Sequence, residues 1–130
     1  MIPRFRVWHK TWEEMGKVKR IRFGDDGNVT TVLFKGETLG ANLKIDEIEL
    51  MQSTGLLDKN GQEIFEGDIL YSELYPVYGV VEYRTNQGMW VNCIKGYGYF
   101  EYLGNVASSR EIVGNVYQNR ELLEANHDRD

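Results

Sequence analysis

The stretch TGLLDKNGQEIFEGDIL, from Thr54 to Leu70, decides how this 130-residue chain folds. Its Asn60-Gly61 pair is typical of a tight hairpin turn, because both residue types tolerate a positive φ angle. Asp58 lies two residues before Asn60, where its carboxylate can accept backbone N–H groups of the turn. Gly67 permits a second bend before the apolar residues that end the stretch. We therefore interpret the stretch as a turn-rich connector that joins two strands.

The acidic residues of this connector also allow a chemical interpretation. An EF-hand loop places Gly at its sixth position, whereas Gly61 is the fourth residue counted from Asp58, so that motif does not fit. Glu63, Glu66 and Asp68 could act as the carboxylates of a metal-dependent hydrolase, although no His lies near them in the sequence. We favour the structural interpretation and keep the hydrolase as the alternative.

Short segments with strand character occur on both sides of the connector. They are rich in Val, Ile and Tyr, and Gly-containing turns separate them. We expect strands at residues 4–9, 19–23, 29–34, 48–54, 68–74, 78–84, 89–95, 97–103 and 112–117. Because a parallel sheet needs crossover helices, this pattern predicts an all-β fold. We expect a helical turn after the last strand, capped by Asn119.

The strand spacing also divides the chain, which we expect to form a single domain. Residues 1–53 form a smaller N-terminal β subregion, and residues 54–67 form the connector. Residues 68–123 have the strand spacing of a small SH3-like barrel, and residues 124–130 form a tail. The sequence therefore predicts a mainly β protein with a barrel-like C-terminal part and a short C-terminal helical turn.

Charge is distributed unevenly along the chain. Residues 1–23 carry seven Lys or Arg against two Glu, a net +5, whereas the remaining residues carry eight against eighteen, a net −10. The basic segment either contacts a nucleic acid or pairs with an acidic body, its own or that of a neighbouring subunit. The candidate phosphate contacts are Arg4, Arg6, Lys17, Lys19, Arg20 and Arg22. Because the net charge of the whole chain is −5, we expect any nucleic-acid binding to be weak.

Other candidate sites favour packing over chemistry. Cys93 alternates with apolar residues and has no second Cys or neighbouring His, so we expect a buried thiol. His9 and His127 are far apart in the sequence, and we expect no metal site and no cofactor. In the segment YGYFEYL we expect Phe100 and Tyr102 to be core residues. No apolar run is long enough to cross a membrane, and a single Cys fits a reducing cytoplasm.

Three blocks frame nearly the whole chain. They are FRVW at residues 5–8, MQSTGLLDKNGQEIFEGDIL at residues 51–70 and EIVGNVYQNRELL at residues 111–123. These blocks resemble the YopX-like family, whose members are encoded mostly by phages and prophages. The departures from the family pattern are Val7 for Ala, His9 for Asp, Ser53 for Tyr and Arg120 for Pro.

The resemblance implies a mostly β fold and a phage setting, and it implies no activity. Within the blocks, the residues that we expect to have structural roles are Asp58, Asn60, Gly61, Glu66, Gly67, Asp68, Gly114 and Asn115.

Two classes of function are consistent with these observations. The sequence favours a non-catalytic interaction module that binds a host or phage macromolecule in the bacterial cytoplasm and forms a homo-oligomer. This preference rests on the basic segment, on the strand edges of two β subregions and on the lack of a catalytic motif. The alternative is the metal-dependent hydrolase that would use Glu63, Glu66 and Asp68, so the question of an enzyme stays open.

Overall fold

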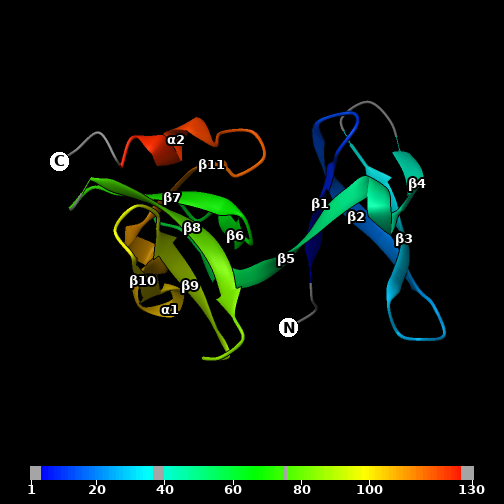
Figure 1. Cartoon of the computed structure of the whole chain (residues 1–130), viewed down its shortest axis with the longest axis horizontal. Helices are drawn as coiled ribbons and strands as arrows, with labels where there is room; N and C mark the ends of the chain where they lie inside the picture. Colours follow the sequence, from blue (N-terminus) through cyan, green and yellow to red (C-terminus); the bar gives the residue numbers. More distant parts are fainter. Residues whose placement is uncertain (1–3, 37–39, 75, 127–130) are drawn as a thin grey trace. The chain divides into compact units, whose positions relative to one another are not determined.

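The computed structural model of the chain describes residues 4–36, 40–74 and 76–126. Most of these residues lie in antiparallel β-strands, which confirms the mainly β prediction. The chain divides into two compact units, with the boundary in the sequence between Gln52 and Ser53, and each unit has its own hydrophobic core (Figure 1). Within the described residues, no helix is long and apolar enough to cross a membrane.

The N-terminal unit is an antiparallel sheet with the strand order β4-β3-β2-β1-β5. Its elements are β1 (Phe5–His9), β2 (Glu14–Phe23), β3 (Val29–Lys35), β4 (Gly40–Lys44), the short 3-10 helix η1 (Ile45–Glu47) and the first part of β5 (Ile48–Leu57). One face of the sheet forms the core of the unit, because alternate residues of a strand point to the same side. The buried residues of this core are Val7, Val32, Phe34, Leu43 and Ile48.

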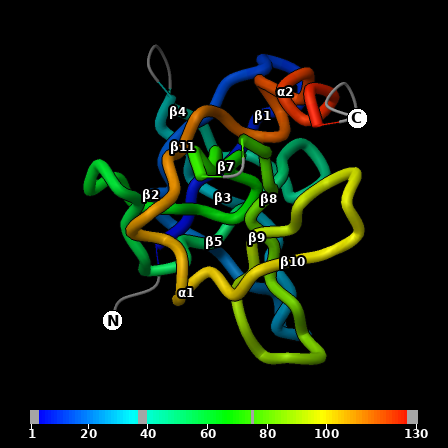
Figure 2. Tube along the Cα trace, turned by 90° about the vertical axis from the view of Figure 1, so that its left-hand side faces the viewer, coloured from blue at the N-terminus to red at the C-terminus, as the bar shows by residue number. Residues whose placement is uncertain are grey.

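The C-terminal unit begins with the second part of β5, which pairs with the short strand β6 (Glu63–Phe65). Its main sheet has the order β10-β9-β8-β7-β11, and Figure 2 shows β7, β8 and β9 side by side. The strands of this sheet are β7 (Asp68–Ser72), β8 (Val77–Arg84), β9 (Met89–Ile94), β10 (Tyr99–Tyr102) and β11 (Glu111–Asn115). The helical elements are α1 (Leu103–Val106), η2 (Ala107–Ser109) and α2 (Glu121–Glu124).

The core of the C-terminal unit joins the main sheet to the elements that cover it. Its buried residues are Ile64, Leu70, Val81, Leu103 and Ala107, which come from β6, β7, β8, α1 and η2. In the described part of the chain, the edge strands β10 and β11 do not pair with each other. The SH3-like barrel therefore stays a prediction, whereas the antiparallel sheet is observed.

Three local expectations were wrong. Asn119 is not the cap of α2, because Arg120 occupies that position and Asn119 Oδ1 accepts the backbone N–H of Asn115 at 3.1 Å. Leu103 begins α1 instead of ending the preceding strand, because its side chain is fully buried in the core of the unit. Asn126 is not part of a loose tail: its side chain is buried and bonds both backbone groups of Tyr78.

The expected burial of two aromatic residues and of the thiol was also wrong. Phe100 is only half-buried, with the guanidinium of Arg84 5.0 Å from its ring centroid, and Tyr102 is exposed. Cys93 is half-buried, and its Sγ lies 3.6 Å from Arg84 Nη2. Cys93 is opposite Val80 and Phe100, whereas Val81 is opposite Asn92, so Cys93 and Phe100 lie on the face of the sheet that does not carry Val81. Tyr102, two residues after Phe100 on β10, lies on the same face as Phe100. His127 lies outside the described residues.

Candidate functional site

The turn at Asp58 is held by the side chain of Asp58 itself. Its Oδ1 accepts the backbone N–H groups of Asn60 at 2.8 Å and Gln62 at 2.9 Å, and its Oδ2 accepts that of Ile112 at 3.0 Å. Burial raises the pKa of this carboxyl, but the N–H donors at Ile112, Gln62 and Asn60 outweigh it and hold the pKa below the ordinary value. Gly61 has a φ of 79°, a conformation that favours Gly. This part of the connector is therefore structural.

The second bend of the connector is structural as well. Gly67 has a φ of 86°, its N–H donates to the carbonyl of Val81 at 2.9 Å, and its carbonyl accepts the N–H of Val116 at 2.9 Å. Asp68 is buried, and its Oδ2 accepts the N–H of Phe65 at 2.8 Å. The bend thus ties β6 to β8 and to the segment that follows β11.

The signature residues near the C-terminus also have local structural roles. Asn115 is buried, and its Oδ1 accepts the N–H groups of Tyr117 and Gln118, each at 3.0 Å. A side chain at Gly114 would overlap Asn119, which therefore packs against bare backbone. The remaining signature residue, Glu66, is half-buried between the end of β6 and Gly67 in the chain.

The three carboxylates of the hydrolase alternative do not form a metal site in this structure. Glu63 accepts the hydroxyl of Ser53, and Asp68 accepts the backbone N–H of Phe65. Among the described residues, no group of three or more His, Cys, Asp or Glu side chains could hold a metal ion.

The outward face of the N-terminal sheet gathers positive charge. Residues directly opposite each other on neighbouring strands share a face. One row runs from Arg6 through Lys17 to Lys35, across β1, β2 and β3. A second row runs from Arg22 through Thr31 to Lys44, across β2, β3 and β4. The cations that share this face, called the basic face below, are Arg6, Lys17, Arg20, Arg22, Lys35 and Lys44.

The basic face differs from the set of cations that the sequence predicted. It includes Lys35 and Lys44, which lie outside residues 1–23 and come to this face only through strand pairing. It does not include Arg4, which precedes β1, and the register assigns no partner to Lys19 because β2 has a bulge there. The hairpin spacing and the alternation on β3 were the signals that could have found Lys35.

The basic face has few negative charges to balance it. Five of its six cations are exposed, namely Lys17, Arg20, Arg22, Lys35 and Lys44. The sixth, Arg6, is half-buried. Within the described residues, no carboxylate lies within 4.0 Å of the charged atoms of these five exposed cations. Glu49, opposite Trp8 in the register, is the acidic residue at the β5 side, and Lys10 pairs with it at 3.5 Å.

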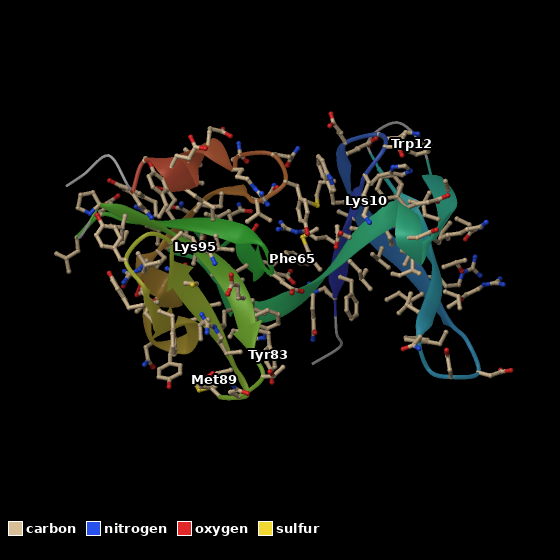
Figure 3. The ribbon with its side chains drawn as sticks, viewed as in Figure 1. Lys10, Trp12, Phe65, Tyr83, Met89 and Lys95 are labelled. Carbon is tan, nitrogen blue, oxygen red and sulfur yellow. The ribbon has the colours of Figure 1, made fainter. Side chains whose placement is uncertain are left out.

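Exposed apolar and aromatic side chains lie on the C-terminal unit. Tyr83 and Met89 are at the end of the β8–β9 hairpin, where Figure 3 shows both of them, and both are about half exposed. Tyr97 and Tyr99 contact each other edge to face near β10 and are also exposed. These residues are spread over a hairpin end and a sheet edge, and scattered exposed apolar side chains of this kind are ordinary on protein surfaces.

The sequence pattern of the family described as YopX protein matches residues 4–124. The chain belongs to the YopX family. This confirms the resemblance that the three sequence blocks indicated. No curated protein matches the chain.

Two solved structures are similar to this YopX family member. Protein EF1440 from Enterococcus faecalis is 26% identical, with a TM-score of 0.65, and the match covers 95% of this chain and 99% of that one. Protein yopX from Bacillus subtilis is 20% identical, with a TM-score of 0.61, and the match covers 92% of this chain and 96% of that one. These likenesses support the fold and bring no activity with them.

Proposed function

We propose that this YopX family member is a non-catalytic interaction module that binds an anionic macromolecule with the basic face of its N-terminal unit. The observation that carries the proposal is the strand register, which puts six cations from β1, β2, β3 and β4 on one side of one sheet. A phage-encoded protein of this kind would act in the cytoplasm of a bacterial host.

The basic face destabilises the free protein through repulsion between like charges. Lys17 and Lys35 are directly opposite each other, and like charges in such pairs destabilise a sheet. No carboxylate among the described residues pairs with either side chain, so none of these residues relieves the repulsion. An anionic partner would remove it on binding, which favours a role for the basic face in recognition.

The carboxylates of the connector support binding over catalysis. General acid-base chemistry needs titratable groups within reach of one another and of a substrate. Of the three carboxylates of the hydrolase alternative, Asp68 is instead buried and accepts the backbone N–H of Phe65, and Glu63 accepts the hydroxyl of Ser53. These groups are already used to hold turns, so we do not assign them to a hydrolase.

A pair of charge reversals tests the proposal. Arg20→Glu changes a cation of the basic face, and Arg120→Glu makes the same change at an exposed position of the C-terminal unit. We expect wild-type protein to bind immobilised heparin at low salt, and Arg20→Glu to elute at clearly lower salt than Arg120→Glu. Equal elution of the two variants would show that net charge, and not the basic face, determines retention.

We also propose that the protein self-associates, because each unit has sheet edges that pair with no other described strand. Light scattering at micromolar concentration tests this point. A single species of 15.1 kDa across that range would reject self-association and would leave the proposal for the basic face unaffected.

A further inference from the structure

We infer that the partner of the basic face is the phosphate backbone of a nucleic acid, and that binding is independent of base sequence. This inference rests on the proposed function, since it names the partner of the same face. The competing partner is an acidic polypeptide, and the nearest candidate is the C-terminal unit of a second copy of this chain.

The C-terminal unit is acidic in composition, but six of its twelve Asp and Glu side chains accept backbone N–H groups or form ion pairs within the unit. Asp58 and Asp68 are buried and accept backbone N–H groups. Four other carboxylates form ion pairs inside the unit. Lys59 pairs with Glu73 at 2.6 Å and with Glu111 at 3.7 Å, Lys95 pairs with Glu82 at 2.8 Å, and Arg110 pairs with Glu101 at 2.6 Å. These six carboxylates already have local partners, so they are less available for new ion pairs with a second copy.

The layout of the cations fits a partner with regularly repeated charge. Neighbouring strands are about 4.8 Å apart, so the three cations of the row that contains Lys17 span about 10 Å. Both rows cross β3, the first at Lys35 and the second at Thr31. These two residues are four positions apart on the strand, so the rows are about 13 Å apart. A nucleic acid presents its charges at short and regular intervals over such an area, about one per 1.7 Å of duplex axis.

The neutral side chains of the basic face have little capacity to read bases. Thr31 lies opposite Arg22 and Lys44, and Leu33 lies opposite Arg20 and Asn42. Of the three neutral residues Thr31, Leu33 and Asn42, Asn42 alone carries an amide group. Sequence is read through hydrogen bonds and apolar contacts to base edges, whereas phosphate contacts carry no sequence information. A face built from Lys and Arg around so few other polar groups therefore favours the backbone.

Fluorescence anisotropy tests this inference with two labelled DNA duplexes of equal length and unrelated sequence, and with polyglutamate as a competitor. We expect the two duplexes to bind within about threefold of each other, and polyglutamate to compete poorly. If five phosphates are neutralised, the slope of log K against log salt concentration should be about −4.5. Tenfold tighter binding of one duplex would overturn the sequence independence.

Two lysine variants test whether the face, and not the basic N-terminal segment, makes the contact. Lys44 lies on the basic face and outside residues 1–23, whereas Lys10 lies within residues 1–23 and pairs with Glu49. We expect Lys44→Ala to weaken duplex binding severalfold and to reduce the salt slope by about 0.9, and Lys10→Ala to do neither. Both residues are exposed, so both variants should fold, which circular dichroism verifies. The opposite pattern would overturn the inference.

The failures of the inference and of the proposed function are distinguishable. If polyglutamate binds at least as tightly as DNA and Arg20→Glu abolishes that binding, the partner is an acidic polypeptide and only the inference is wrong. If neither polyanion binds at low salt, both the inference and the proposed function are wrong.

Discussion

Asp58 Oδ2 accepts the backbone N–H of Ile112 at 3.0 Å, a bond between residues that are 54 positions apart. The same turn is joined to this region a second time, because the N–H of Lys59 donates to the carbonyl of Arg110 at 2.9 Å. Asp58 belongs to the central block that the YopX family shares, and Ile112 belongs to the C-terminal block. The two blocks are thus parts of one contact.

We expect Asp58→Ala to lower the free energy of unfolding by about 2–4 kcal/mol. The substitution leaves three backbone N–H donors without their acceptor, at a position that is only 5% exposed. Urea unfolding at neutral pH measures the change. A loss below about 0.5 kcal/mol would show that the turn forms without this carboxylate.

Acid should remove the same stabilisation in the wild-type protein. The folded-state pKa of Asp58 lies below its unfolded value, so the contribution is complete above the unfolded value and is lost as the pH falls towards the folded one. We expect the difference in unfolding free energy between wild type and Asp58→Asn to shrink as the pH is lowered from 6 to about 3. A difference that stays constant would contradict this role.

Gly61→Val should destabilise the protein by about 1–2 kcal/mol, because Gly61 has a φ of 79° and a β-branched residue is strained there. The control is Gly104→Ala in α1, where an added Cβ meets no atom within 4 Å and Ala is the better helix former. We expect the control to leave the melting temperature unchanged or to raise it. Equal effects of the two substitutions would remove the turn interpretation.

Gly79 and Asn92 should behave as a coupled pair. A Cβ at Gly79 would overlap the side-chain amide of Asn92, which is 1% exposed and donates to Glu101 Oε1 at 3.2 Å. We expect Gly79→Ala to cost about 2–3 kcal/mol, and to cost much less when Asn92→Ala is already present. Additive effects in a double-mutant cycle would show that the two residues do not constrain each other.

His9→Asp should preserve the fold of the N-terminal unit. His9 Nδ1 accepts the backbone N–H groups of Thr11 at 3.2 Å and Trp12 at 3.1 Å, as the carboxylate of an Asp can at the start of a turn. The family pattern has Asp at this position, so the acceptor is kept although the residue differs. We expect His9→Leu to be less stable than His9→Asp by about 1 kcal/mol or more in thermal unfolding, and the reverse order would contradict this account.

The parts of the structure that the sequence predicted are those with short-range causes. The strands follow from alternation of residue types, and the turn at Asp58 follows from an acceptor next to Asn-Gly. The part that it did not predict depends on strand register. Lys35 and Lys44 join the basic face because the register puts them opposite Lys17 and Thr31. The bulge in β2 between Val18 and Arg20 puts Arg20 and Arg22 on the same face as Lys17, and one residue of slip would turn side chains to the other face.

Composition was also a poor guide to available charge. The excess of acidic residues predicted an acidic body for the basic segment, but many of these carboxylates hold turns or form ion pairs within the C-terminal unit. Net charge does not show which carboxylates already have a cation or a backbone N–H group as a local partner. The sequence also did not predict the burial of Asn126, because its hydrogen bonds to Tyr78 and Lys95 join residues far apart in the sequence.

The central claim is that the basic face binds a nucleic acid, and mapping the contact by NMR tests it most directly. We would titrate ¹⁵N-labelled protein with a short DNA duplex at low salt and follow the backbone amide signals. We expect the shifts to concentrate in β2, β3 and β4, around Lys17, Arg20, Lys35 and Lys44, and to disappear as salt is added. Shifts concentrated in the C-terminal unit, or no shifts at all, would contradict the claim.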